Sequence, residues 1–142
     1  MLSAFHAAQL AAPAQEVWRY IAWENLELMA PGGLFEAVHY QERRPRPGAL
    51  RRVRLAGGLE IVERLEEQDA AERRMRYRMV DLGDAPLSEY EGEVLVTPKG
   101  AHACAIRFAC RYYPISDEGD DFAPTYRAMQ RAFVDYIRSQ VE

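Results

Sequence analysis

The sequence predicts an α+β fold in which one long C-terminal helix covers a curved antiparallel sheet of about seven strands. Three observations predict it. One strand and two short helical segments come first, and six further strands then follow with almost no helical pattern. Polar and apolar residues alternate along these strands, which is typical of an antiparallel sheet covered on one face only. An amphipathic helical stripe ends the chain, and we expect a single domain over residues 1–142.

The first elements are a strand and two short helices. We expect the strand over Ser3–Ala11, and Pro13 both ends it and suits the first turn of a helix. The apolar residues of that helix recur at helical spacing: Val17, Trp18 and Ile21. A second short helix is predicted over Asn25–Met29 and ends at the breakers Ala30–Gly33.

The predicted sheet is completed by six strands in direct succession. They cover Leu34–Glu42, Ala49–Ala56, Leu59–Gln68, Glu72–Val80, Ser88–Thr97 and His102–Tyr113. Gly57 and Gly58 predict a two-residue hairpin turn, and residues 81–87 a loop. The alternation assigns faces, because successive side chains of a strand point to opposite sides.

The last helix is predicted to begin near Asp120 or Asp121, either of which can cap it, with Pro124 in the first turn. Its apolar stripe consists of Phe122, Tyr126, Met129, Phe133, Ile137 and Val141. A curved sheet and one helix enclose space when inward side chains are small. Several predicted inward residues are small or medium in size: Ala37, Val53, Gly92, Cys104 and Cys110. We therefore expect an internal cavity.

Composition and charge exclude several classes of protein. The chain is 49% hydrophobic and 28% charged, a globular balance, and no stretch is long and apolar enough for integral membrane association. A net charge of −4 argues against binding to nucleic acid. Cys104 and Cys110 would lie roughly 20 Å apart on one strand, too far for a disulfide. We expect reduced thiols, no signal peptide, a cytoplasmic location, and a monomer or homodimer.

Six segments, in this order, match a known superfamily: Ala12–Trp18, Glu24–Gly32, Pro47–Arg51, Ile61–Leu65, Tyr90–Gly92 and Val96–Pro98. On these segments the sequence resembles the SRPBCC superfamily, and within it the polyketide cyclase/dehydrase-like branch. The superfamily also includes the lipid-transfer START domains and the major birch pollen allergen class. The resemblance implies the helix-grip fold and an internal cavity for a small, largely apolar ligand. It does not decide the activity, because the superfamily holds enzymes, carriers and binding modules.

Glu63 and Arg51 are the first candidate catalytic residues. Glu63 shares a face with Ile61 and Leu65, so its carboxylate is expected inside the sheet, where a charge needs a partner or a function. Arg51 lies close to it across the predicted hairpin and can pair with it. The pair could anchor a ligand carbonyl or hydroxyl, with Glu63 as general base. It could equally be a structural ion pair.

Tyr77 and Tyr90 complete the candidate catalytic set, as phenols that orient a ligand oxygen. They could equally be core aromatics. The remaining predicted ligand-binding residues line the inward faces of the strands and the last helix. They are Val38, Tyr40, Val53, Ile61, Met75, Met79, Phe108, Tyr112, Tyr126, Met129 and Phe133.

No metal or cofactor is expected. His6, His39 and His102 have no metal-ligand spacing, and His39 is expected to face outward. Neither cysteine has a basic neighbour on its own face to activate it. Arginine-rich outer faces at residues 43–54 and 74–78 are balanced by nearby glutamates, so cross-strand ion pairs explain them. An anionic membrane surface or an acidic carrier protein is the alternative partner.

Three functions remain open. The resemblance implies a cofactor-independent cyclase, dehydratase or aromatase acting on a polyketide-like molecule of bacterial secondary metabolism, since enolisation and dehydration need only placed acids, bases and carbonyl polarisers. A non-catalytic carrier or sensor of an apolar ligand, lipid-transfer-like, is the first alternative. A protein-interaction module of the co-chaperone type is the second.

Overall fold

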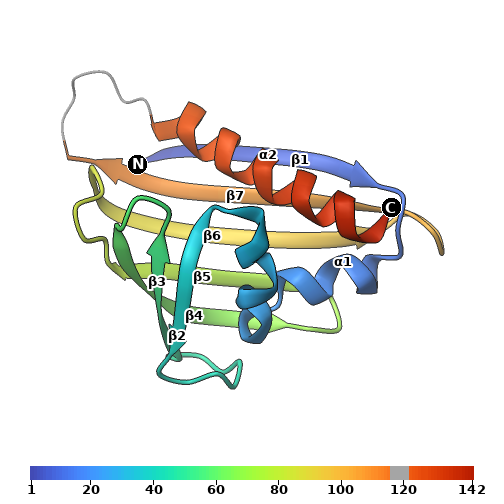
Figure 1. The fold of residues 1–142 in the computed structure, drawn as a ribbon, viewed down its shortest axis with the longest axis horizontal. Coiled ribbons are helices and arrows are strands. Elements are labelled where there is room, and N and C mark those ends of the chain that lie inside the picture. The colour runs from blue at the N-terminus through green and yellow to red at the C-terminus, as the bar shows by residue number, and fades with distance from the viewer. Residues whose placement is uncertain (116–121) are drawn as a thin grey trace.

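A computed structural model describes residues 1–115 and 122–142 (Figure 1). The strands are β1 (Leu2–Leu10), β2 (Phe35–Tyr40), β3 (Leu50–Leu55), β4 (Glu60–Asp69), β5 (Arg74–Asp81), β6 (Leu87–Pro98) and β7 (Cys104–Pro114). The helices are α1 (Ala14–Ile21), the 3₁₀ segment η1 (Trp23–Gly32) and α2 (Phe122–Val141). These elements confirm the predicted α+β class and the order along the chain.

The seven strands form one antiparallel sheet in the order β1-β7-β6-β5-β4-β3-β2. Strands β2 to β7 follow one another as a meander, and β1 adds at the far edge beside β7. The three helices lie on the same side of the sheet, with α2 crossing in front of β1 and β7 (Figure 1). The sheet therefore has one covered face and one open face, as the alternation predicts.

Strand β4 shows how the alternation builds the two faces. Ile61, Glu63 and Leu65 are 4%, 6% and 0% exposed, whereas the residues between them are partly exposed. Strand β7 follows the same rule, because its alternate residues from Cys104 to Tyr112 are all buried. The period of two is what commits each side chain to one face.

Helix α2 differs from the predicted stripe by a small rotation about its axis. Its buried residues are Tyr126, Gln130, Val134 and Ile137. Phe122, Met129, Phe133 and Val141 are only partly buried. The helix packs against both β1 and η1, and these two contacts decide which face turns inward. The predicted caps, Asp120 and Asp121, lie outside the described residues.

Two local predictions are wrong. The segment after α1 is a 3₁₀ helix over Trp23–Gly32 rather than a shorter helix over Asn25–Met29. The breaker Pro31 lies inside it, and the segment ends at Gly33, whose φ of 84° suits glycine. The β3–β4 hairpin has a three-residue loop, because Leu55 N–H bonds to the carbonyl of Leu59 and leaves Ala56, Gly57 and Gly58 outside the ladder.

Candidate functional site

The concave face of the sheet and the helices line a partly open cavity of about 110 Å³. Its apolar wall contains seven residues predicted as ligand contacts: Val53, Ile61, Met75, Met79, Phe108, Met129 and Phe133. All four candidate catalytic residues, Arg51, Glu63, Tyr77 and Tyr90, also line it. The fold thus brings strands β3 to β7 and helix α2 together around one space.

Four predicted ligand contacts do not line this cavity: Val38, Tyr40, Tyr112 and Tyr126. The Tyr40 hydroxyl donates to the carbonyl of Trp23 at 2.8 Å and accepts from the N–H of Leu26 at 3.0 Å, so it anchors η1 to β2. Val38 pairs with Val53 in the β2–β3 ladder. Strand β2 is the edge of the sheet and contacts η1, and of its residues Phe35 lines the cavity.

The other two residues belong to an aromatic cluster beside the cavity. The ring of Tyr112 packs on Phe122 with centroids 4.8 Å apart. The ring of Tyr126 lies 6.5 Å from that of Tyr90. These contacts place Tyr112 and Tyr126 behind Tyr90, one layer further from the enclosed space.

Arg51 and Glu63 form a buried ion pair. Arg51 Nε donates to Glu63 Oε1 at 2.7 Å, and the two side chains are 3% and 8% exposed. Arg51 Nη1 also donates to the carbonyl of Trp23 at 2.8 Å, and its guanidinium lies 4.0 Å from the centre of the Trp23 ring. Arg51 is therefore held on three sides. Glu63 Oε2, by contrast, accepts no hydrogen bond within residues 1–115 and 122–142.

Tyr77 and Tyr90 lie next to this pair. Their hydroxyl oxygens are 3.3 Å apart, and their ring centroids are 6.0 Å apart. Burial and the negative charge of Glu63 raise the pKa of Tyr77 above its usual value. Burial and the neighbouring Tyr77 raise the pKa of Tyr90. Both phenols stay protonated at neutral pH, so they can donate a hydrogen bond to a ligand oxygen.

Gly92 makes room for the Tyr77 ring. A Cβ atom at Gly92 would lie 2.4 Å from Tyr77 Cζ and 2.6 Å from its hydroxyl oxygen. The two residues are direct partners in the β5–β6 ladder. Gly92 was expected to leave empty space, but the Tyr77 ring covers it and lies across β6.

Cys104 and Cys110 are free and buried. Burial raises the pKa of Cys110 to about 11, against hydrogen bonds with Tyr90 and Tyr126. Burial also raises the pKa of Cys104. Neither thiol has the lowered pKa of a nucleophile.

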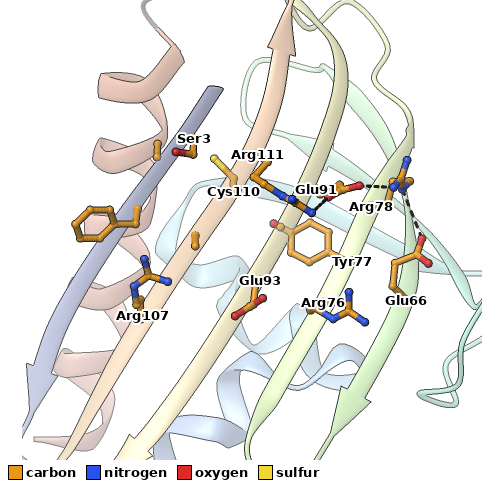
Figure 2. Close-up of a pocket in the computed structure, with 14 residues that line it drawn as sticks. Ser3, Glu66, Arg76, Tyr77, Arg78, Glu91, Glu93, Arg107, Cys110 and Arg111 are labelled. Carbon is orange, nitrogen blue, oxygen red and sulfur yellow. Dashed lines mark hydrogen bonds and ion pairs between the residues drawn. The ribbon is translucent and has the colours of Figure 1, made fainter. Parts of the chain in front are cut away.

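A larger hollow of about 380 Å³ lies on the open face of the sheet (Figure 2). Four arginines and three glutamates line it: Arg76, Arg78, Arg107, Arg111, Glu66, Glu91 and Glu93. The charges largely neutralise one another, because Arg78 and Arg111 both bond to Glu91 and Arg78 also faces Glu66 (Figure 2). This matches the expected network of cross-strand ion pairs, so the apolar cavity between the sheet and the helices is the better candidate site despite its smaller volume.

Gln130 is a cavity residue that the sequence analysis missed. It is 6% exposed and lines the space from α2. A pattern in the sequence could have found it, because it lies four residues after Tyr126 and four before Val134. A polar residue in the centre of an apolar face is the informative exception.

Metal ligands and membrane spans are absent from the described ranges. Within residues 1–115 and 122–142, no group of three or more His, Cys, Asp or Glu side chains could hold a metal ion. His39 is exposed on β2, as predicted. In the same part of the chain, every helix is too short or too polar to cross a membrane.

Comparisons with known proteins agree with this geometry. Solved structures with the same fold include XoxI from Bacillus cereus, with a TM-score of 0.84 and 14% identity, covering 99% of this chain and 96% of that one. Norcoclaurine synthase from Thalictrum flavum has a TM-score of 0.75 and 21% identity, covering 98% and 85%. The di-domain aromatase/cyclase BexL of the BE-7585A biosynthetic pathway has a TM-score of 0.73 and 23% identity, covering 98% and 46%.

A search of curated proteins gives no match. The model of the family described as "Polyketide cyclase / dehydrase and lipid transport" matches residues 1–142. The whole-chain match, the seven-stranded helix-grip sheet and the apolar cavity lead to one conclusion: this chain is a ligand-binding member of the polyketide cyclase/dehydrase and lipid transport family.

Proposed function

We propose that the protein is a cofactor-independent acid–base enzyme that acts on a small oxygenated molecule, in the manner of a cyclase, dehydratase or aromatase. The observation that carries this proposal is the state of Glu63. One carboxylate oxygen is held by Arg51 at 2.7 Å, and the other has no donor in the described part of the chain. A charged oxygen that is fixed in place beside an apolar cavity is suited to accept a proton.

The chemistry follows from the neighbours of Glu63. The Tyr77 hydroxyl can donate a hydrogen bond to a ligand carbonyl oxygen, which stabilises the negative charge that forms there. Glu63 Oε2 can then take a proton from the carbon next to that carbonyl, so the C–H electron pair becomes the enolate double bond. The same proton can return to carbon or leave with a hydroxide as water. Enolisation and dehydration both balance in this way without an added oxidant or reductant.

The cavity volume limits the size of the ligand. Drug-sized ligands occupy pockets of about 300–1,000 Å³, whereas a cavity of about 150 Å³ holds a benzene molecule. At about 110 Å³, the cavity is smaller than the latter, so a short chain or a single ring is the largest ligand that it suits, and a ring requires wall side chains to shift. Norcoclaurine synthase is described in complex with dopamine and hydroxybenzaldehyde, which are one-ring compounds, and this supports a ligand of that size.

A non-catalytic carrier or sensor is the second candidate. It is favoured by the pairing of Arg51 with Glu63, since these are the two charged residues among the described ones that line the cavity. A paired, neutral interior binds an apolar molecule without needing to react with it. A long-chain lipid would require the partly buried Met79, Met129 and Phe133 to move aside.

Deuterium exchange into acetophenone distinguishes the two candidates. This ketone has one ring, a carbonyl group and an enolisable methyl group, and it exchanges very slowly in neutral D₂O without a catalyst. We expect the wild-type protein to accelerate the loss of the methyl ¹H NMR signal. Glu63→Gln should abolish the acceleration, and Tyr77→Phe should reduce it about 10²-fold or more.

The matched control is Glu66→Gln, because Glu66 lies on the same strand and faces the open side. It should exchange acetophenone at the wild-type rate. Binding of acetophenone to the wild type without any exchange would contradict the enzyme proposal and leave the carrier. Native mass spectrometry of the purified protein adds an independent test, since a co-purifying small molecule identifies the ligand class.

We further propose a cytoplasmic location, a monomer or homodimer, and no nucleic-acid partner. The supporting observations are the two free thiols and the net charge of −4. Size-exclusion chromatography with light scattering tests the oligomeric state.

A further inference from the structure

Gln130 occupies an unusual place in the helix that covers the cavity. It lies on the buried face of α2, between Tyr126 and Val134, and is 6% exposed. Its neighbours at the cavity wall, Met129 and Phe133, are apolar. Gln130 therefore lines the same space as the candidate catalytic residues.

Within residues 1–115 and 122–142 no protein group bonds to the Gln130 amide, and its polar atoms are not among the side-chain atoms that are both fully buried and unbonded. A glutamine amide can accept two hydrogen bonds and donate two, and placing it beside an apolar wall without a protein partner costs free energy. A methionine or leucine would fill the same place without that cost. Stability therefore does not explain this residue, whereas a bound molecule with a polar group would satisfy it.

The cavity thus has polar groups on two sides. Glu63, Tyr77 and Tyr90 belong to the sheet, and Gln130 belongs to the covering helix. Apolar side chains such as Ile61 and Phe108 also line the cavity. A ligand that matches this arrangement has an apolar body and two separate hydrogen-bonding groups.

We propose that Gln130 is a specificity-determining contact that binds the second polar group of a one-ring, doubly oxygenated ligand. This inference rests on the proposed function of the cavity. The amide can serve a hydroxyl group, which donates and accepts, or a carbonyl group, which accepts only. A polar site of this kind selects strongly against ligands that lack the matching group, because its own groups would then stay unpaired.

Resorcinol and m-cresol test the proposal, because they differ only by a hydroxyl in place of a methyl group. Affinities for both are measured by NMR chemical-shift titration, with the wild type and with Gln130→Met. We expect the variant to lose about 10-fold in affinity for resorcinol and to change less than about twofold for m-cresol. The melting temperature of the ligand-free variant should rise by about 2–4 °C, since the unbonded amide is gone.

Gln140→Met is the matched control, because Gln140 is exposed near the end of the same helix and methionine and glutamine have similar helix propensity. It should change neither the affinity ratio nor the melting temperature. An unchanged ratio in Gln130→Met would overturn the role of Gln130 and leave the ligand-binding cavity intact. A lower melting temperature or a failure to fold would also overturn it, because both indicate a structural role. If neither compound binds the wild type at millimolar concentration, the proposed cavity function falls together with this inference.

Discussion

Each face of the sheet carries an ion pair between an arginine and a glutamate. One pair is buried, and the other is exposed to solvent. On the covered face, Arg51 and Glu63 are 3% and 8% exposed, and they bond at 2.7 Å. On the open face, Arg54 and Glu60 bond at 3.0 Å with side chains 53% and 38% exposed. Both pairs join β3 to β4, so the strands and the residue types are matched. What differs is the solvent, and the difference shows that burial decides what an ion pair contributes.

Water and salt screen the outer pairs, which are typically worth about 0–1 kcal/mol each. The inner pair has lost its hydration, so each charge depends on its partner. The open face therefore tolerates change at any single position. On the covered face, substitution of one of the few buried charged residues should have a large effect on stability.

The largest expected effect is the loss of the buried pair. Glu63→Leu leaves the Arg51 guanidinium buried without its carboxylate and should lower the free energy of unfolding by about 3–5 kcal/mol. Urea denaturation measures the change. The matched substitution Glu60→Leu, at the first residue of the same strand, should have a much smaller effect because water screens that pair. Equal losses at the two positions would contradict the comparison.

Removing both charges sharpens this prediction. The double variant Arg51→Met/Glu63→Leu should recover most of the stability lost in Glu63→Leu, because no unpaired charge remains. No recovery would mean that Arg51 contributes mainly through its contacts with Trp23.

A smaller effect is expected at Gly92, where the covered face is tightly filled. Gly92→Ala places a Cβ atom 2.4 Å from Tyr77 Cζ, so the ring must move, and overpacking of this kind costs about 1–3 kcal/mol. Near-UV circular dichroism should report the displaced tyrosine. The double variant Gly92→Ala/Tyr77→Leu should regain stability relative to Gly92→Ala, and no gain would place the strain elsewhere.

The two faces should also affect the pH dependence of stability differently. The covered face should contribute at alkaline pH, and the open face at acidic pH. Burial raises the pKa of Cys110 from 9.0 to about 11, so the folded state favours the neutral thiol. Its contribution is complete below pH 9 and is lost as the pH rises from about 9 to 11. The hydrogen bond from Arg54 lowers the pKa of Glu60 from 4.5, so that contribution is present above pH 4.5 and is lost as the pH falls through the lowered value.

Urea midpoints measured across the pH range check both limits. Cys110→Ser should flatten the alkaline side alone, and Glu60→Gln should flatten the acidic side alone. A Cys110→Ser curve that keeps the wild-type slope between pH 9 and 11 would argue against this assignment.

The smallest effect is expected for single charges of the open face. Glu67 bonds to Arg74 and Arg76 at 2.9 Å, with its side chain 42% exposed. Glu67→Gln should change the free energy of unfolding only slightly, and the change should disappear in 1 M salt because the Debye length is then about 3 Å. If the loss of stability persists in high salt, Glu67 contributes through more than its ion pairs with Arg74 and Arg76.

Much of the fold and part of the site could be predicted from local patterns. The period of two placed Glu63 inside with Ile61 and Leu65, and the hairpin placed Arg51 opposite it, because register and face follow directly from strand geometry. Strand ends were predicted to within one or two residues. The η1 segment was not, since its turns depend on the bonds that Tyr40 makes to it across the sheet edge.

The residues that define the cavity depended more on packing. Gln130 was missed and Tyr126 was expected at the wall, because the rotation of α2 is decided by its contacts with β1 and η1 rather than by its own stripe. Gly92 suggested empty space, but the ring of its cross-strand partner Tyr77 covers it. Shape complementarity between distant segments has no local pattern.

The amino-acid sequence by itself determined the order of the elements, the two faces of each strand and the meeting of Arg51 with Glu63. Local periodicity and turn chemistry carry that information, and they act over a few residues. Only the tertiary structure decided the size of the cavity, the open oxygen of Glu63 and the rotation of α2 that turns the face of Gln130 inward. These features arise where the helices close over the curved sheet, because the volume and the unpaired groups left inside depend on how all the side chains pack together.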